Sequence, residues 1–128
     1  MSEIVVLIVD DEPLIRMDLA DMVQDAGYVA LEAAHADEAI GLLETQPAIR
    51  ILVTDIEMPG SMDGLKLAAA VRERWPPVVI IVTSGRVLPA TTQLPSETVF
   101  LGKPYQGAAM SAALNDAVAT LRRGKSTG

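Results

Sequence analysis

The polar residues best suited to chemistry in this sequence each come just after a short apolar run. They are Asp10 and Asp11 after residues 4–9, Asp55 after residues 51–54, Ser84 after residues 78–82, and Lys103 after residues 98–101. Three carboxylates brought together repel one another, at a cost of about 4 kcal/mol for each pair at a separation of ~4 Å. A positively charged partner must therefore offset that repulsion.

A hard divalent cation suits such a group of carboxylates. Mg²⁺ binds oxygen ligands, often one or two carboxylates together with waters and phosphate oxygens. Zinc is not expected, because the chain has no cysteine and its one histidine, His35, occupies what we interpret as a solvated turn. We therefore expect Mg²⁺ as the cofactor, and Lys103 as a second positive charge that pairs with Asp55 and with an anion added to it.

A carboxylate beside a metal ion and a lysine can act as a nucleophile toward phosphorus, which gives an aspartyl phosphate. The metal and Lys103 would neutralise charge on the transferred group, and Ser84 could donate a hydrogen bond to it. We prefer Ser84 to its neighbour Thr83 because the small Gly85 follows it. Structural alternatives stay open: Asp55 could be a turn or N-cap residue, and the acidic pair could cap the following helix.

Alternating strands and helices would bring these residues together. Unbroken apolar runs predict strands buried on both faces, and helical spacing of apolar residues predicts helices between them. The predicted strands are 4–9, 28–33, 51–55, 78–82 and 98–101, and the predicted helices are 13–25, 37–44, about 63–75, and a closing helix with a stripe of Met110, Leu114, Ala117 and Leu121. Pro89 and Pro95 leave room for only a shortened or irregular fourth helix in residues 86–96.

This alternation predicts an α/β fold with a parallel sheet covered on both faces. Right-handed crossovers favour a doubly wound, flavodoxin-like (βα)5 arrangement with strand order 2-1-3-4-5. Ligands of such sheets bind at the carboxyl ends of the strands near the switch point between strands 1 and 3. Asp10, Asp11 and Asp55 are expected to lie there.

Length and composition limit the possible classes of protein. The 128 residues, half of them apolar, suit one domain, expected over residues 1–123 with a flexible tail at 124–128. A net charge of −7 with scattered lysines and arginines argues against a nucleic-acid surface. No apolar run approaches the roughly 18 residues of a membrane span and no basic leader is present, so a cytoplasmic protein without a membrane partner is expected.

Taken together, these motifs resemble the receiver domain of two-component response regulators, over residues 4 to about 121. No one motif is specific, but four in this order, each at a strand end, are. The matching pieces are residues 9–13 with the acidic pair, Asp55 with Met58-Pro59 and Asp63-Gly64 after it, Thr83-Ser84-Gly85, and Lys103-Pro104-Tyr105.

The resemblance implies that Asp55 accepts a phosphoryl group from a histidine kinase or a histidine phosphotransfer protein. It implies Mg²⁺ on Asp10, Asp11, Asp55 and the backbone carbonyl of Glu57, a switch in which Ser84 moves toward the phosphoryl group and Phe100 turns inward, and a cis Lys103–Pro104 bond. A core position is the alternative for Phe100. The Glu57 side chain is expected to point to solvent near the site, with an influence on phosphoryl lifetime as its functional possibility, and Met58 is expected to pack.

Two departures from the family pattern affect the expected surface. The loop after Met58-Pro59 has three residues, 60–62, where the family usually has two. Residues 86–96 replace the helix that the family uses for partners and dimers, so a monomer or weak homodimer is expected. We expect a stand-alone switch with slow autodephosphorylation and an unknown downstream protein target, not a conventional enzyme. Two rival functions are a flavodoxin-like cofactor-binding module and a Mg²⁺-dependent phosphohydrolase with Asp55 as nucleophile.

Overall fold

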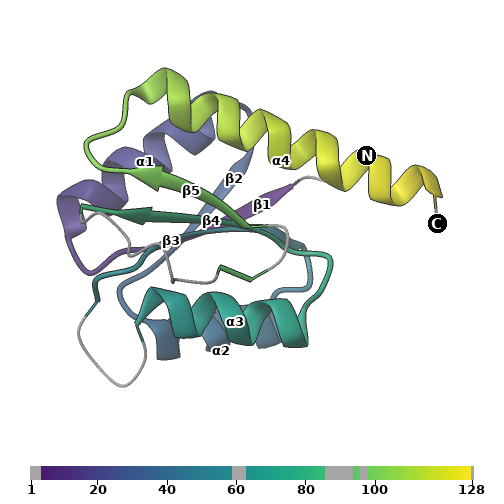
Figure 1. The fold of residues 1–128 in the computed structure, drawn as a ribbon, viewed down its shortest axis with the longest axis horizontal. Helices are drawn as coiled ribbons and strands as arrows, with labels where there is room; N and C mark the ends of the chain where they lie inside the picture. Colours follow the sequence, from purple (N-terminus) through teal and green to yellow (C-terminus); the bar gives the residue numbers. More distant parts are fainter. Residues whose placement is uncertain (1–3, 59–62, 86–93, 96–97, 128) are drawn as a thin grey trace.

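The structure, a computed structural model, describes residues 4–58, 63–85, 94–95 and 98–127. Strands and helices alternate along these residues, as Figure 1 shows. In chain order they are β1 Val5–Val9, α1 Pro13–Asp25, β2 Val29–Ala33, α2 Ala36–Thr45, β3 Ile49–Asp55, α3 Gly64–Arg74, β4 Val79–Ser84, β5 Thr98–Gly102 and α4 Gly107–Thr127. The short helix expected in residues 86–96 and the loop departure at 60–62 fall wholly or mostly outside the described residues.

The five strands form one parallel sheet in the order β2-β1-β3-β4-β5, which confirms the predicted topology. Val9 at the end of β1 pairs with Thr54, and Asp55 at the end of β3 pairs with Thr83. Ser84 at the end of β4 pairs with Gly102. The polar residues at or just after the ends of β1, β3, β4 and β5 therefore lie along one edge of the sheet.

Each face of the sheet buries its own apolar cluster. Successive strand residues alternate between the faces, so Leu7 packs with α2 and α3, whereas its neighbour Ile8 packs with α1 and α4. Figure 1 shows these two helix pairs on opposite sides of the sheet. Leu67 of α3 and Leu114 of α4 are completely buried in their respective clusters. Burial on both faces explains why these strands are apolar without alternation.

Local signals in the sequence explain where most helices begin. Pro13 occupies the first turn of α1, where its missing N–H costs nothing. Asp63 caps α3, because its Oδ1 accepts a hydrogen bond from Lys66 N–H at 2.9 Å. His35 lies at the predicted turn, is exposed, and caps α2 by accepting a hydrogen bond from Glu38 N–H at Nδ1. The acidic pair does not cap α1, whose N-cap is Glu12.

The closing helix α4 runs from Gly107 to Thr127. It includes Gly124, because a glycine inside a helix costs only about 1 kcal/mol relative to alanine. The flexible tail expected over residues 124–128 stays a prediction. The predicted stripe on this helix is confirmed: Met110, Leu114 and Ala117 are buried, and Leu121 packs against the same cluster.

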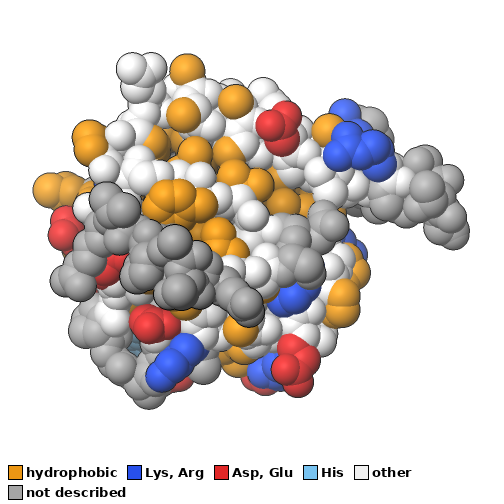
Figure 2. All heavy atoms as spheres, viewed as in Figure 1, with side chains coloured by type: hydrophobic (Ala, Val, Ile, Leu, Met, Phe, Trp, Pro, Cys, Tyr) orange, Lys and Arg blue, Asp and Glu red, His pale blue; other side chains and the backbone are white. Residues whose placement is uncertain are grey.

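The surface and the helices add two observations. On the face drawn in Figure 2, the described lysine and arginine side chains lie in several separate places among acidic, apolar and neutral ones. Among the helices in the described part of the chain, none is both long and apolar enough to cross a membrane.

Candidate functional site

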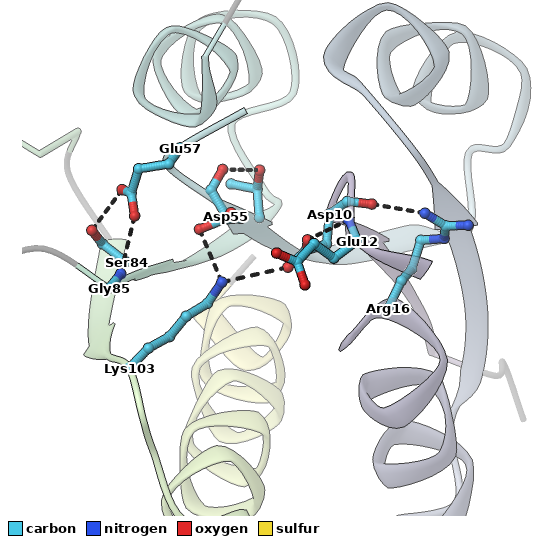
Figure 3. Close-up of polar contacts among 9 residues, drawn as sticks. Asp10, Glu12, Arg16, Asp55, Glu57, Ser84, Gly85 and Lys103 are labelled. Atoms are coloured by element: carbon cyan, nitrogen blue, oxygen red, sulfur yellow. Dashed lines mark hydrogen bonds and ion pairs between the residues drawn. The ribbon is translucent and has the colours of Figure 1, made fainter. Parts of the chain in front are cut away.

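Asp55 lies at the centre of a group of charged side chains on the carboxyl edge of the sheet. β3 delivers it beside the end of β1, so the Asp10 carboxyl approaches it from the neighbouring strand (Figure 3). Both carboxyls are buried, with Asp10 1% and Asp55 6% exposed. The structure thus brings together the acidic residues that the sequence placed at separate strand ends.

Three carboxylates at this edge could hold a metal ion. One oxygen from each of Asp10, Asp11 and Asp55 lies within 4.8 Å of the others. Asp10 Oδ2 and Asp55 Oδ1 are buried, and Lys103 Nζ is the described cation that lies near both of them. One lysine beside three carboxylates leaves negative charge that a metal ion would offset. An all-oxygen donor set fits Mg²⁺.

Lys103 supplies a positive charge to the same group. Its Nζ lies 3.2 Å from Asp55 Oδ1 and 3.6 Å from Asp10 Oδ2, close enough for ion pairs with both carboxylates. Its backbone N–H donates to the Ser84 carbonyl at 2.7 Å, which ties the end of β5 to the end of β4. The Lys103–Pro104 bond is cis, as the family resemblance implied.

The electrostatic balance of the site shows that one lysine does not neutralise it. Burial raises the pKa of the Asp55 carboxyl; attraction to Lys103 lowers it, repulsion by Asp10 raises it again, and the net direction is upward. For Lys103, burial alone would lower the pKa, but the charges of Asp55 and Asp10 outweigh it and the net direction is also upward. Both groups therefore hold protons more tightly than usual, and a further cation would relieve the excess negative charge.

The Glu57 side chain takes part in the site, and the prediction that it lies in solvent is wrong. Its Oε2 accepts a hydrogen bond from Ser84 Oγ at 2.6 Å, and its Oε1 accepts one from Gly85 N–H at 3.0 Å. The cause is local, because β4 ends with two donors beside the loop that carries Glu57. Glu57's carbonyl as a metal ligand stays a prediction.

The remaining predicted residues lie in varied surroundings. Ser84, which we preferred to Thr83 as the donor to the phosphoryl group, is 1% exposed. Its hydroxyl donates a hydrogen bond to the Glu57 carboxylate. Phe100 is 36% exposed, so the alternative of a core position is wrong, while its inward turn stays a prediction. Met58 packs in the cluster under α2 and α3, as expected. Asp10 Oδ1 accepts a hydrogen bond from Glu12 N–H at 2.9 Å, which fixes the carboxyl at the start of α1.

Sequence reasoning missed Arg16 and the close packing of Gly64, both of which shape the site. Arg16, one turn into α1, donates from one guanidinium nitrogen to the Asp10 carbonyl at 2.8 Å and pairs with Glu32 of β2 at 3.1 Å. A basic residue shortly after an acidic pair was the available signal. Gly64 lies against the backbone of Asp55 and Ile56, and its N–H donates to the Ile56 carbonyl at 3.0 Å. No periodicity in the sequence reports such a close approach.

Comparisons with known proteins agree with this geometry. Residues 6–115 match the family model of the response regulator receiver domain. The positive alginate biosynthesis regulatory protein of Pseudomonas aeruginosa is 42% identical over 117 residues, which cover 88% of this chain and 46% of that protein. The transcriptional regulatory protein PdtaR of Mycobacterium tuberculosis is 33% identical over 120 residues, covering 91% of this chain and 58% of that protein. The chain thus spans about half the length of these two relatives.

Solved structures give the same result for the fold. The chemotaxis protein CheY4 of Vibrio cholerae superposes with a TM-score of 0.81 at 27% identity, covering 90% of this chain and 98% of that one. A response regulator receiver protein of Sinorhizobium medicae superposes with a TM-score of 0.84 at 27% identity, covering 93% and 97%. From the family match, the identity to these relatives and the shared fold, the chain belongs to the receiver domain family of two-component response regulators.

Proposed function

We propose that Asp55 accepts a phosphoryl group from a phosphohistidine on a partner histidine kinase or phosphotransfer protein. The observation that carries the proposal is the position of its carboxylate, which ends a buried strand 3.2 Å from Lys103 Nζ and within 4.8 Å of two further carboxylates. This is a nucleophile with positive charge beside it and with further oxygen ligands for a metal close by. Membership of the receiver family supports the same role.

In the transfer, an Asp55 oxygen forms the new bond to phosphorus, and the bond between phosphorus and the donor's imidazole nitrogen breaks with its electron pair left on that nitrogen. Lys103 stays paired with Asp55 and stabilises negative charge on the transferred oxygens. Mg²⁺ held by Asp10, Asp11, Asp55 and the Glu57 carbonyl would supply further charge neutralisation. Arg16 keeps the end of β1 in place by bonding the Asp10 carbonyl.

The loaded form would act as a switch. The Ser84 hydroxyl would donate a hydrogen bond to the phosphoryl group. Phe100, which is exposed in this structure, would turn inward. The hydrogen bond from Lys103 N–H to the Ser84 carbonyl, 2.7 Å long, links the two strand ends through which such a change would pass. We expect the surface of β5 and the turn at 103–105 to change, and a downstream protein to read that change.

The proposal is tested with a small phosphodonor and Mg²⁺. We expect labelling to stop at one phosphoryl group per chain, and to be lost in Asp55→Asn or when Mg²⁺ is chelated. Asp63→Asn is the matched control. It also replaces an aspartate with asparagine, at the end of the segment that follows β3, and asparagine can still cap α3. Continuous release of phosphate would favour the phosphohydrolase instead, and normal labelling of Asp55→Asn would refute the assigned acceptor.

A second variant tests the coupling role of Lys103. Lys103→Ala should keep Mg²⁺ binding but lose the surface change that follows phosphorylation, measured as chemical shift changes in residues 98–105. Lys66→Ala removes the same charge from an exposed position on α3 and should respond like the wild type. A normal surface change in Lys103→Ala would contradict the coupling.

A further inference from the structure

Glu57, in the segment after β3, holds the end of β4 through both oxygens of its carboxylate. Oε2 accepts from Ser84 Oγ at 2.6 Å and Oε1 accepts from Gly85 N–H at 3.0 Å (Figure 3). A hydroxyl and a backbone N–H side by side at a strand end are a suitable pair of donors for an anion. In this structure the anion that they bind is a side chain of the protein itself.

The same two donors lie next to the level of Asp55 in the sheet. Asp55 pairs with Thr83, so Ser84 and Gly85 continue β4 just beyond that level. Ile56 N–H donates to the Thr83 carbonyl at 2.9 Å, which keeps the two strand ends in register up to this point. A phosphoryl group on Asp55 would add three oxygens beyond the end of β3, beside the end of β4.

We propose that Glu57 is a positioning residue that competes with the phosphoryl group for the Ser84 hydroxyl and the Gly85 N–H, an inference that rests on Asp55 being the phosphoryl acceptor. Two anions cannot share these donors, because each donor hydrogen makes one strong bond and like charges repel. Loading of Asp55 therefore requires Glu57 to release the end of β4. The strength of its hydrogen bonds with Ser84 and Gly85 therefore affects the equilibrium between the unloaded and the loaded form.

The contact also explains how the unloaded form keeps Ser84 in one place. The hydrogen bond from Ser84 is short, as expected when the acceptor is an ionised carboxylate. Because the Ser84 carbonyl accepts from Lys103 N–H, the end of β4 is held from both sides, by Glu57 and by the start of the turn after β5. Release of Glu57 frees one of these two sides.

The competition is tested with beryllofluoride and Mg²⁺, since beryllofluoride on a carboxylate has the tetrahedral shape and charge of a phosphoryl group. The half-saturating concentration should fall about tenfold in Glu57→Gln and in Glu57→Ala, because a charge-assisted hydrogen bond no longer competes. Glu12→Gln is the control, as it removes the same charge from an exposed side chain after the neighbouring strand β1. An equal gain in Glu12→Gln would assign the effect to net charge and overturn the competition.

A second measurement on the unloaded protein needs no phosphodonor. In Glu57→Ala, the amide resonance of Gly85 should move and its hydrogen exchange should accelerate, while the Lys103 amide stays protected and shows that the strand ends are intact. An unchanged Gly85 amide would overturn the contact. A wild-type chain that binds no beryllofluoride refutes the proposed function and the competition with it, whereas binding that is unchanged in both Glu57 variants refutes the competition alone.

Discussion

Gly64→Ala should destabilise the fold at the point where α3 meets the backbone of the phosphoryl acceptor. A Cβ at this position would lie 2.7 Å from the carbonyl carbon of Asp55 and 2.7 Å from Cα of Ile56, and in harder contact with the Asp55 carbonyl oxygen. All these atoms are backbone, so no side-chain rotation relieves the overlap. Overpacking of this kind costs about 1–3 kcal/mol.

Two smaller terms act on the same substitution. If α3 moves back, the hydrogen bond from Gly64 N–H to the Ile56 carbonyl, 3.0 Å long, weakens at a cost of about 0.5–1.5 kcal/mol. Alanine in place of glycine returns at most about 0.5–1 kcal/mol, since Gly64 is the first residue of α3 and not an interior one. The middle of these ranges gives an expected loss of about 2 kcal/mol in the free energy of unfolding.

Urea unfolding measures this change. With a slope of about 1–3 kcal/mol per molar urea, the midpoint should fall by about 1 M or more at unchanged slope. Gly41→Ala is the matched control: it lies inside α2, a Cβ there meets nothing within 4 Å, and the substitution should stabilise by about 0.5–1 kcal/mol. A Gly64→Ala protein as stable as the wild type would refute the close-approach argument.

Three further predictions concern capping, metal binding and a half-buried phenol. Asp63→Ala should cost about 1 kcal/mol in urea unfolding, because α3 loses its N-cap, and an unchanged midpoint would contradict the cap. Mg²⁺ at a hundred times its dissociation constant for the wild type should raise the free energy of unfolding by about 2.7 kcal/mol, measured by thermal unfolding. An equally large gain in Asp10→Asn at the same Mg²⁺ concentration would exclude the Asp10 carboxylate as a ligand. Burial, with the charge of Asp10 next in size, raises the pKa of Tyr105 to about 12, so in Tyr28→Phe the phenolate absorbance should appear near pH 12 when folded and near about 10 in denaturant. Because the folded state keeps this proton, the stability from the neutral phenol is present below about pH 10 and is lost as the pH rises toward 12.

The strand order and the grouping of the acidic residues could be predicted because they depend on long, unambiguous signals. β1, residues 51–53 of β3 and residues 79–82 of β4 are unbroken apolar runs that are followed by polar residues, and few topologies accommodate such strands with helices between them. Parallel strands place their carboxyl ends together, so Asp10, Asp55 and Lys103 had to meet once the topology was known.

The direction of single side chains could not be predicted in the same way. Glu57 binds Ser84 and Gly85 because its backbone leaves β3 in a conformation that periodicity does not encode. The sequence alone did not locate the end of α4, which runs to Thr127, because one glycine is a weak stop signal. The capping role of His35 was missed because a ring nitrogen is an uncommon acceptor at an N-cap.

The division of the core into two clusters has a consequence for how this sequence can vary. Leu67 and Leu114 lie on opposite faces of the sheet and share no cluster, so changes around one should leave the packing around the other intact. Core residues beneath α2 and α3 can thus be substituted during evolution without compensating substitutions beneath α1 and α4. The strands themselves contribute to both clusters, and at their carboxyl ends the substitutions on the two faces must remain compatible with the same site.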